Sequence, residues 1–240
     1  MKAQATRAPG RIDAVIFDLD GVLLDTEENM RRAFTEAWRS THSDRPPPFE
    51  RFSTMLGAPL SEIIAALNLP PHAVEIFAHA STRWQSLVVA FDNIKELLTK
   101  LDRVKVPVAI ATGKTQARAL EALDSADLAN YFDVVIGSDM VTAPKPAPDS
   151  LHLALTHLEA KSGVGRPFKN PIYVGDAPRD IQAAKAAEIT SVAVGWGQTS
   201  PHMLLSERPD HYVSTVSDLT TWLYQHCTAQ IARTDVNTAN

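Results

Sequence analysis

Five short apolar runs recur along the chain, and they limit the possible folds more than any other feature of the sequence. These runs are rich in β-branched residues and cover residues 14–17, 106–111, 134–136, 172–174 and 191–194. From Val106 onward, segments with helical spacing separate the runs, which is typical of βαβ units. Because the runs are continuously apolar, we expect strands that are covered on both faces. The sequence therefore predicts an α/β fold with a Rossmann-like parallel sheet as its core.

The first two runs are separated by residues 18–105, several times the length that one crossover helix requires. Within this stretch, a helix is expected after Asp25, because apolar residues fall on one stripe at Met30, Ala33, Phe34, Ala37 and Trp38. Further helices are expected at 60–67 and 71–89. The sequence thus predicts a small inserted α-helical cap at 26–90, a core at 11–25 and 91–226, and flexible tails at 1–10 and 227–240.

Two helices allow more specific predictions, a capping box for one and an apolar stripe for the other. Asp25 and Glu28 have the spacing of a capping box at the start of the first cap helix. After Thr115, a crossover helix is expected to place its apolar residues on one stripe, at Ala119, Leu120, Leu123 and Leu128.

Charge and cysteine content exclude several classes of protein. The 240 residues include 23 Lys and Arg against 28 Asp and Glu, a net charge of -5, so there is no basic surplus for nucleic acid or an anionic membrane. Cys227 is the single cysteine, which excludes an intrachain disulfide and a cysteine-based zinc site.

No window reaches a membrane-spanning length, and the polar start lacks the apolar segment of a signal peptide. We expect a cytoplasmic protein; the sequence gives no signal for its oligomeric state.

Polar residues follow the expected strands at the edge where open parallel sheets bind their ligands. They are Asp18 and Asp20, then Thr112, then Lys145, then Asp176 and Asp180. Carboxylates that lie this close raise one another's pKa unless a divalent cation neutralises them. Oxygen ligands from aspartate suit Mg²⁺, which commonly shares its site with a phosphate. An aspartate can then attack phosphorus, with a second carboxylate as acid and base, while Lys145 and Thr112 bind phosphoryl oxygens.

The same residues resemble the motifs of one family. The segment at 13–22, DAVIFDLDGV, followed by Asp25-Thr26-Glu27, resembles the first motif of phosphatases of the haloacid dehalogenase (HAD) superfamily, and Thr112, Lys145 and Gly175-Asp176…Asp180 resemble the other three. The insert resembles the helical (C1) cap of phosphoglycolate-phosphatase-like members.

The resemblance implies a role for each residue. Asp18 would attack phosphorus and become an aspartyl phosphate, and Asp20 would protonate the leaving alcohol and then activate water. Thr112 and Lys145 would hold the phosphoryl group. Mg²⁺ would be bound by Asp18, by the backbone carbonyl of Asp20 and by Asp176, with Asp180 in a supporting role. The implied activity is Mg²⁺-dependent hydrolysis of a small phosphorylated metabolite, similar to phosphoglycolate or a sugar phosphate.

Two alternatives stay open. Mutases of the β-phosphoglucomutase type usually carry a histidine where this chain has Met30, which disfavours a mutase. A non-catalytic protein that binds a phosphate ligand would not require Asp20. Dehalogenases and phosphonate hydrolases of the same superfamily lack a carboxylate at the position of Asp20.

Other positions concern the cap and the backbone. Candidate substrate contacts in the cap are Arg31, His42, Arg51, Arg83, Trp84 and the turn at 56–59, although solvated charges and packed aromatics are the commoner roles of such residues. Lys114 and Arg118 are left outside the catalytic set. Glu188 stands where the resembled family often has glycine; if this site is a left-handed helix C-cap, a non-glycine residue there is mildly strained. Asp92-Asn93 stands where the cap returns to the core.

Overall fold

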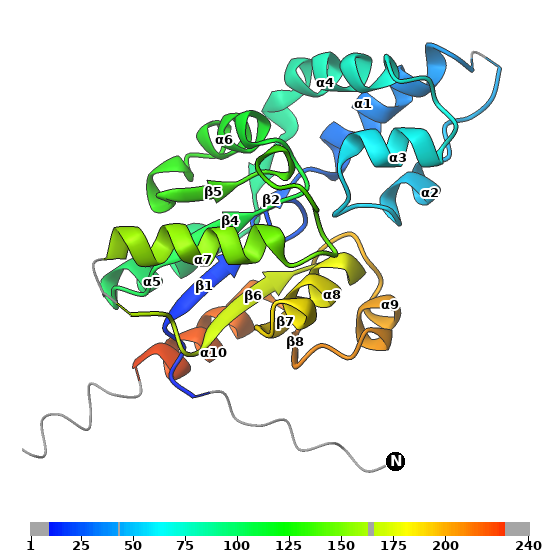
Figure 1. Ribbon diagram of the computed structural model, residues 1–240. Helices are drawn as coiled ribbons and strands as arrows, with labels where there is room; N and C mark the ends of the chain where they lie inside the picture. Colours follow the sequence, from blue (N-terminus) through cyan, green and yellow to red (C-terminus); the bar gives the residue numbers. More distant parts are fainter. Residues whose placement is uncertain (1–9, 43, 163–165, 229–240) are drawn as a thin grey trace, which may run out of the picture.

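A six-stranded parallel sheet forms the centre of the molecule in the computed structural model, which describes residues 10–42, 44–162 and 166–228 (Figure 1). The strand order is β5-β4-β1-β6-β7-β8. The strands are β1 (Ala14–Phe17), β4 (Val108–Ala111), β5 (Val134–Ile136), β6 (Pro171–Gly175), β7 (Thr190–Val194) and β8 (His211–Val213). The predicted α/β fold and all five predicted strands are confirmed. Strand β8 was not predicted, because it is a short edge strand with no fully buried residue.

The register of the sheet aligns the ends of its central strands. Phe17, the last residue of β1, pairs with Ile110 of β4 and with Val174 of β6. The residues that directly follow β1, β4 and β6 therefore lie at the same edge of the sheet.

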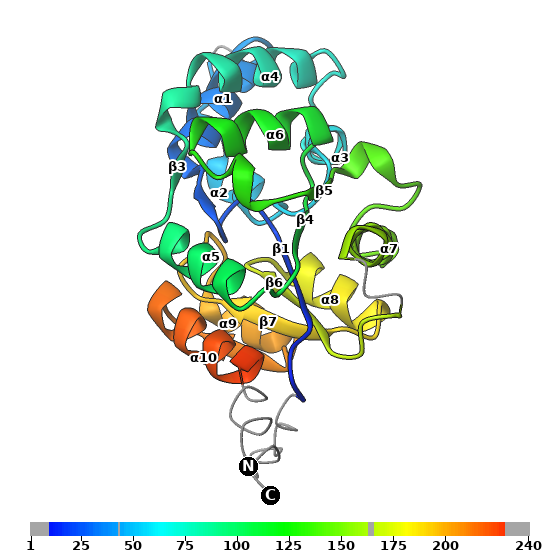
Figure 2. The same cartoon turned by 90° about the vertical axis from the view of Figure 1, so that its left-hand side faces the viewer.

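Helices cover both faces of the sheet, as continuously apolar strands require. On one face, Val15 and Phe17 pack in a cluster with residues of α5 (Ile94–Arg103), α6 (Gln116–Ser125) and α10 (Val216–Thr228). On the other face, Ala14 and Ile16 pack with residues of α7 (Asp149–Ser162) and α8 (Pro178–Ala186). Figure 2 shows the two helical layers on opposite sides of β1. A short helix, α9 (Pro201–Ser206), follows β7.

A second group of helices lies beyond the end of the sheet toward which β1 points (Figure 1). It comprises α1 (Glu27–Arg39), α2 (Phe49–Ser53), α3 (Leu60–Ala66) and α4 (Ala73–Arg83). We call these helices and the loops between them the cap. The cap has its own apolar cluster, in which the ring of Phe52 stacks on Phe34 at 4.6 Å and on Phe77 at 5.7 Å between centroids. The division into core and cap at residues 26 and 90 stays a prediction.

Two chain segments connect the cap to the sheet. Strand β2 (Leu24–Asp25), just before α1, pairs antiparallel with β3 (Val89–Ala90), just before the chain returns to α5. Asn93 has a left-handed φ of 68° at the N-terminus of α5, in the Asp92-Asn93 segment. The two crossing segments are thus held together at the base of the cap.

Several local expectations need correction. The capping box at Asp25 and Glu28 is wrong: α1 begins at Glu27, and Oδ1 of Asp25 accepts the Glu27 N–H at 3.2 Å instead. The helix expected at 71–89 ends at Arg83 and is followed by a 3₁₀ turn, η1 (Gln85–Leu87), and β3. Leu120 is 45% exposed, so it lies outside the apolar stripe of α6, whereas Ala119, Leu123 and Leu128 are buried.

A residue with a left-handed backbone follows the end of α8. Glu188 adopts a left-handed φ of 58°, which is the condition under which a non-glycine residue at this position is mildly strained. The N–H of Ile189 donates to Ala184 O at 2.9 Å, which closes the last turn of the helix.

The predicted tails lie largely outside the described residues. Residues 1–9 and 229–240 are not described, but α10 continues to Thr228 and Cys227 is buried, so the start of the second tail at 227 is wrong. Among the residues that the structure describes, no helix is both long and apolar enough to cross a membrane.

Candidate active site

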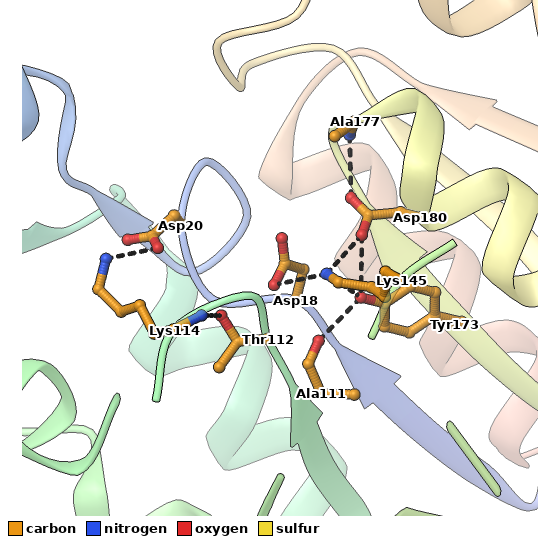
Figure 3. Close-up of polar contacts among 9 residues, drawn as sticks. All are labelled: Asp18, Asp20, Ala111, Thr112, Lys114, Lys145, Tyr173, Ala177 and Asp180. Atoms are coloured by element: carbon orange, nitrogen blue, oxygen red, sulfur yellow. Dashed lines mark hydrogen bonds and ion pairs between the residues drawn. The ribbon is translucent and has the colours of Figure 1, made fainter. Parts of the chain in front are cut away.

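Asp18 is the first residue after β1 and lies at the centre of a polar cluster (Figure 3). Its N–H donates to the carbonyl of Val174 on β6 at 2.9 Å, which continues the sheet pairing past the end of the strand. The side chain is buried, as are those of Thr112, Lys145, Asp176 and Asp180. The edge of the sheet thus brings five of the six predicted site residues into a buried environment.

Lys145 is the cation at the centre of this cluster. Its Nζ lies 3.1 Å from Oδ1 of Asp18 and 2.6 Å from Oδ1 of Asp180, and it donates to the hydroxyl of Tyr173 at 2.8 Å. Burial alone would lower the pKa of Lys145, but attraction to the two carboxylates outweighs burial and raises it. Lys145 is therefore held as a charged ammonium group against Asp18.

Tyr173 is a site residue that the sequence did not reveal. Its hydroxyl, buried beneath Lys145, donates to the carbonyl of Ala111 at 2.9 Å. The residue lies within the apolar run of β6, where a tyrosine has the pattern of a core residue, so no local signal distinguished it. It connects the ammonium group of Lys145 to the end of β4 and fixes its position.

Three carboxylates form a candidate metal site. Carboxylate oxygens of Asp18, Asp176 and Asp180 all lie within 4.8 Å of one another. Burial, with smaller effects from neighbouring carboxylates, raises the pKa of Asp18 to about 7 and raises that of Asp176 well above its usual value. Negative charge on these buried carboxylates is unfavourable unless a cation neutralises it. Their oxygen atoms are the ligands that a divalent cation such as Mg²⁺ prefers, so the cluster fits such an ion.

The hydrogen bonds divide these carboxylates by role. Asp180 accepts from Lys145 at Oδ1 and from the Ala177 N–H at Oδ2, at 3.0 Å, so both of its oxygens already have partners. Asp176 accepts from the Gln198 N–H at Oδ2, at 3.0 Å. Asp18 and Asp176 are thus better placed to bind a metal directly, and Asp180 to orient Lys145.

Two glycines leave space around Asp176. A Cβ on Gly21, which has a φ of +76°, would lie 2.1 Å from Oδ2 of Asp176, and a Cβ on Gly197 would lie 2.3 Å from the same oxygen. Real atoms do not approach this closely, so any other residue at either position would displace the carboxylate. The glycine of the Asp-Leu-Asp-Gly motif therefore serves both a left-handed turn and the position of Asp176.

Asp20 is held separately from the three-carboxylate cluster. Its Oδ2 lies 2.5 Å from Nζ of Lys114, and its Oδ1 is buried without a hydrogen-bond partner among the described residues. The N–H of Lys114 also donates to Oγ1 of Thr112 at 3.3 Å. Lys114, which was left outside the predicted catalytic set, therefore contacts both Asp20 and Thr112, and its position two residues after Thr112 was the available signal. The carboxylate of Asp20 is not a member of the metal cluster.

A cavity of about 370 Å³ opens between this cluster and the cap. Its wall includes Asp18, Asp20, Thr112, Asp176 and Lys114. Arg118, also left out of the predicted set, lines the cavity as well, and its guanidinium donates to Oγ of Ser81 on α4 at 2.6 Å. A larger cavity, of about 680 Å³, lies at the opposite ends of the strands and contains none of the predicted site residues.

The predicted substrate contacts in the cap fall into two groups, residues that line the cavity and residues that do not. The turn at Leu56, Gly57, Ala58 and Pro59 lines the cavity, but Arg31, His42, Arg51, Arg83 and Trp84 do not. Arg31 pairs with Glu27, Arg83 and Trp84 both bind Glu36, and Arg51 donates to a backbone carbonyl. His42 stacks on Trp38. These five residues have the structural roles that are common for such side chains.

Comparisons with known proteins agree with this geometry. The family model described as haloacid dehalogenase-like hydrolase matches residues 15–194. The chain is 29% identical over 214 residues to "Pyrophosphatase PpaX" of Listeria monocytogenes, covering 88% of this chain and 95% of the relative. It is 32% identical over 218 residues to "Probable phosphatase IndB" of Dickeya dadantii, covering 85% and 90%. A hydrolase from Pseudomonas syringae has a similar structure, with a TM-score of 0.75, 26% identity and coverage of 88% and 97%. The chain therefore belongs to the haloacid dehalogenase-like hydrolases and is a phosphatase-type enzyme of that family.

Proposed function

We propose that the chain is a Mg²⁺-dependent phosphatase that hydrolyses a small phosphomonoester through an aspartyl phosphate on Asp18. The observation that carries this proposal is the pair of carboxylates, Asp18 and Asp20, on the wall of one cavity, each beside its own lysine. The two carboxylates have different surroundings, since Asp18 belongs to the buried metal cluster and Asp20 does not. Different surroundings suit different roles in a reaction.

Lys145 and Thr112 bind the phosphoryl group in this proposal. Both are buried beside Asp18, and Thr112 follows β4 as Asp18 follows β1. A fixed ammonium group and a hydroxyl stabilise the charge that develops on phosphoryl oxygens during transfer. Because Tyr173 and Asp180 hold Lys145, this charge is in position before the substrate arrives.

The reaction has two steps. An oxygen of Asp18 forms a bond to phosphorus while the bond from phosphorus to the leaving oxygen breaks, and the protonated Asp20 gives its proton to that oxygen. In the second step, Asp20 takes a proton from water, whose oxygen attacks phosphorus and releases phosphate and free Asp18. Lys114 holds one oxygen of Asp20, and the other oxygen has no hydrogen-bond partner among the described residues, so it is the one left to act on the leaving group and the water in this proposal.

Asp18 and Asp176 would hold the metal ion, together with the backbone carbonyl of Asp20. Asp180 would support the site through Lys145, since both of its oxygens already accept hydrogen bonds. When bound, Mg²⁺ supplies positive charge that neutralises the carboxylates and the phosphoryl oxygens. The raised pKa values of Asp18 and Asp176 support this assignment.

The test is phosphate release from p-nitrophenyl phosphate and a panel of small phosphoesters, with and without Mg²⁺. Phosphoglycolate and sugar phosphates, which the family resemblance implies, belong in the panel. We expect release that requires both Mg²⁺ and Asp18, so Asp18→Asn is inactive, while Asp44→Asn, an exposed carboxylate outside the cavity, is unchanged. If the folded protein with Mg²⁺ releases no phosphate from any panel member, the phosphatase proposal fails in favour of a mutase or a phosphate-binding protein.

A further inference from the structure

The cavity above Asp18 has two walls of opposite character. The wall from the sheet and its loops is polar, with Asp18, Asp20, Thr112, Lys114 and Arg118 among its members. The wall from the cap is apolar, and it includes Met30, Phe52, Leu56, Ile63, Val74 and Phe77. Among the cap residues of this wall that the structure describes, Ser61 alone carries a hydroxyl, amide or charged side chain.

The apolar wall is fixed by the packing of the cap. Phe52 and Phe77 are buried and stacked on each other, and Met30 and Ile63 belong to the same cluster. The nearby cap arginines are engaged elsewhere, as in the ion pairs of Arg31 with Glu27 and Arg83 with Glu36. Side-chain rotation within this packed cluster therefore brings no hydrogen-bonding group into the cavity.

The wall determines what kind of leaving group the cavity favours. The phosphoryl group must lie at the polar wall, beside Asp18, so the remainder of the substrate faces the cap. A leaving group rich in hydroxyls would exchange its hydrogen bonds to water for contacts with aromatic and aliphatic side chains, which is unfavourable. An apolar leaving group would instead leave water for a surface that matches it.

We propose that the substrate is a phosphomonoester whose leaving group is predominantly apolar, such as a branched alkyl or aryl alcohol, rather than a polyhydroxylated sugar. This inference rests on the proposed phosphatase function and adds the substrate class to it. The cap selects the leaving group through the apolar wall, while the polar wall handles the phosphoryl group common to all substrates.

Two substrates of matched size test the proposal on the wild-type enzyme. Cyclohexylmethyl phosphate and glucose 6-phosphate both carry a primary phosphate on a six-membered ring, but the second ring bears hydroxyls. We expect kcat/KM to be about 100-fold or more higher for cyclohexylmethyl phosphate, since a pocket discriminates by this order when polar groups lack partners. Comparable or better hydrolysis of glucose 6-phosphate overturns the inference.

A variant of the wall provides a second measurement. Val74→Thr keeps the shape of the side chain and adds one hydroxyl to the wall, and we expect the preference for cyclohexylmethyl phosphate to fall about threefold to tenfold. Val104→Thr is the matched control, because Val104 is also partly buried but packs against the main core, away from the cavity. An unchanged preference in folded Val74→Thr, with melting temperature checked, contradicts the role of the wall.

The outcomes separate this inference from the function on which it rests. If p-nitrophenyl phosphate and glucose 6-phosphate are hydrolysed well and cyclohexylmethyl phosphate poorly, the enzyme is a phosphatase and the apolar preference is wrong. If none of the three is hydrolysed in the presence of Mg²⁺, the phosphatase function fails and the inference fails with it.

Discussion

Replacing Lys145 with methionine removes the cation from the buried cluster while keeping a chain of similar length. Lys145 is 2% exposed, and its ammonium group lies 3.1 Å from Asp18 and 2.6 Å from Asp180, whose side chains are 5% and 1% exposed. The Lys145→Met variant therefore leaves these carboxylates buried without their counter-ion. In metal-free buffer, no Mg²⁺ is present to replace the lost charge.

The distances set the scale of the effect. At an effective dielectric constant of about 20, each of the two attractions is about 5–6 kcal/mol, and the dehydration of a buried ammonium group offsets several kcal/mol of this. Removal of one partner from a buried ion pair costs about 3–5 kcal/mol in the free energy of unfolding. For a chain of this size, such a loss lowers the melting temperature by about 6–20 °C.

The loss depends on pH in a predictable direction. In the wild type, burial raises the pKa of Asp18 from 3.8 to about 7, and Lys145 opposes this rise. Without Lys145 the pKa of Asp18 rises further, so the folded variant binds a proton that the unfolded chain releases, and its stability increases as pH falls. The difference from wild type is therefore largest above about pH 7 and smaller near pH 5.

Urea unfolding of both proteins in EDTA, at several pH values, measures this prediction. Lys95→Met is the matched control: its exposed pair with Asp127, at 3.3 Å, should change the free energy of unfolding by less than about 1 kcal/mol. A Lys145→Met variant as stable as wild type at pH 8, or one that loses more stability at low pH than at high pH, would refute the reasoning.

Three further predictions concern other parts of the molecule. Gly21→Ala should weaken Mg²⁺ binding, because its Cβ would displace the Asp176 carboxylate; calorimetric titration measures this, with Gly57→Ala, whose nearest contact is an ordinary 3.4 Å, as control. Asp20→Asn should lower kcat/KM, which reports the step that releases the alcohol, by about 10²–10⁴-fold for an alkyl phosphate and by less for p-nitrophenyl phosphate, whose leaving group needs no proton; equal losses of kcat/KM would contradict the acid role. Cys227, buried with its pKa raised to about 11, should resist disulfide reagents at pH 8 until the protein unfolds, and rapid labelling of the native enzyme would contradict its burial.

The strands of the core could be predicted because a sheet covered on both faces requires continuous apolar runs. Strands β2 and β3 were not predicted from apolar runs, because each is only two residues long and too short to give a periodic signal. The end of the last cap helix was also predicted wrongly. The apolar residues continue to Val89, but the chain leaves the helix at Trp84 and then pairs with β2.

The candidate site was predictable where its residues follow strands. Asp18, Thr112 and Asp176 stand directly after β1, β4 and β6, so parallel pairing alone brings them to one edge. Tyr173 was missed because it reaches the site from within an apolar strand. Arg118 was named but left outside the catalytic set, because a charged residue on a helix is as compatible with a role on the helix surface. The apolar wall of the cavity was equally hidden, since residues of the cap core and residues that face the cavity share one helical pattern.

The central claim is that Asp18 carries the phosphoryl group during turnover. The most direct measurement is a single-turnover reaction with Mg²⁺ and p-nitrophenyl phosphate, quenched in acid and analysed by mass spectrometry of the peptide that contains Asp18. We expect a transient phosphate on Asp18 in the wild type, a longer-lived one in Asp20→Asn, in which water activation is impaired, and none in Asp18→Asn. Phosphate release without any adduct on Asp18, together with an active Asp18→Asn variant, would contradict the account.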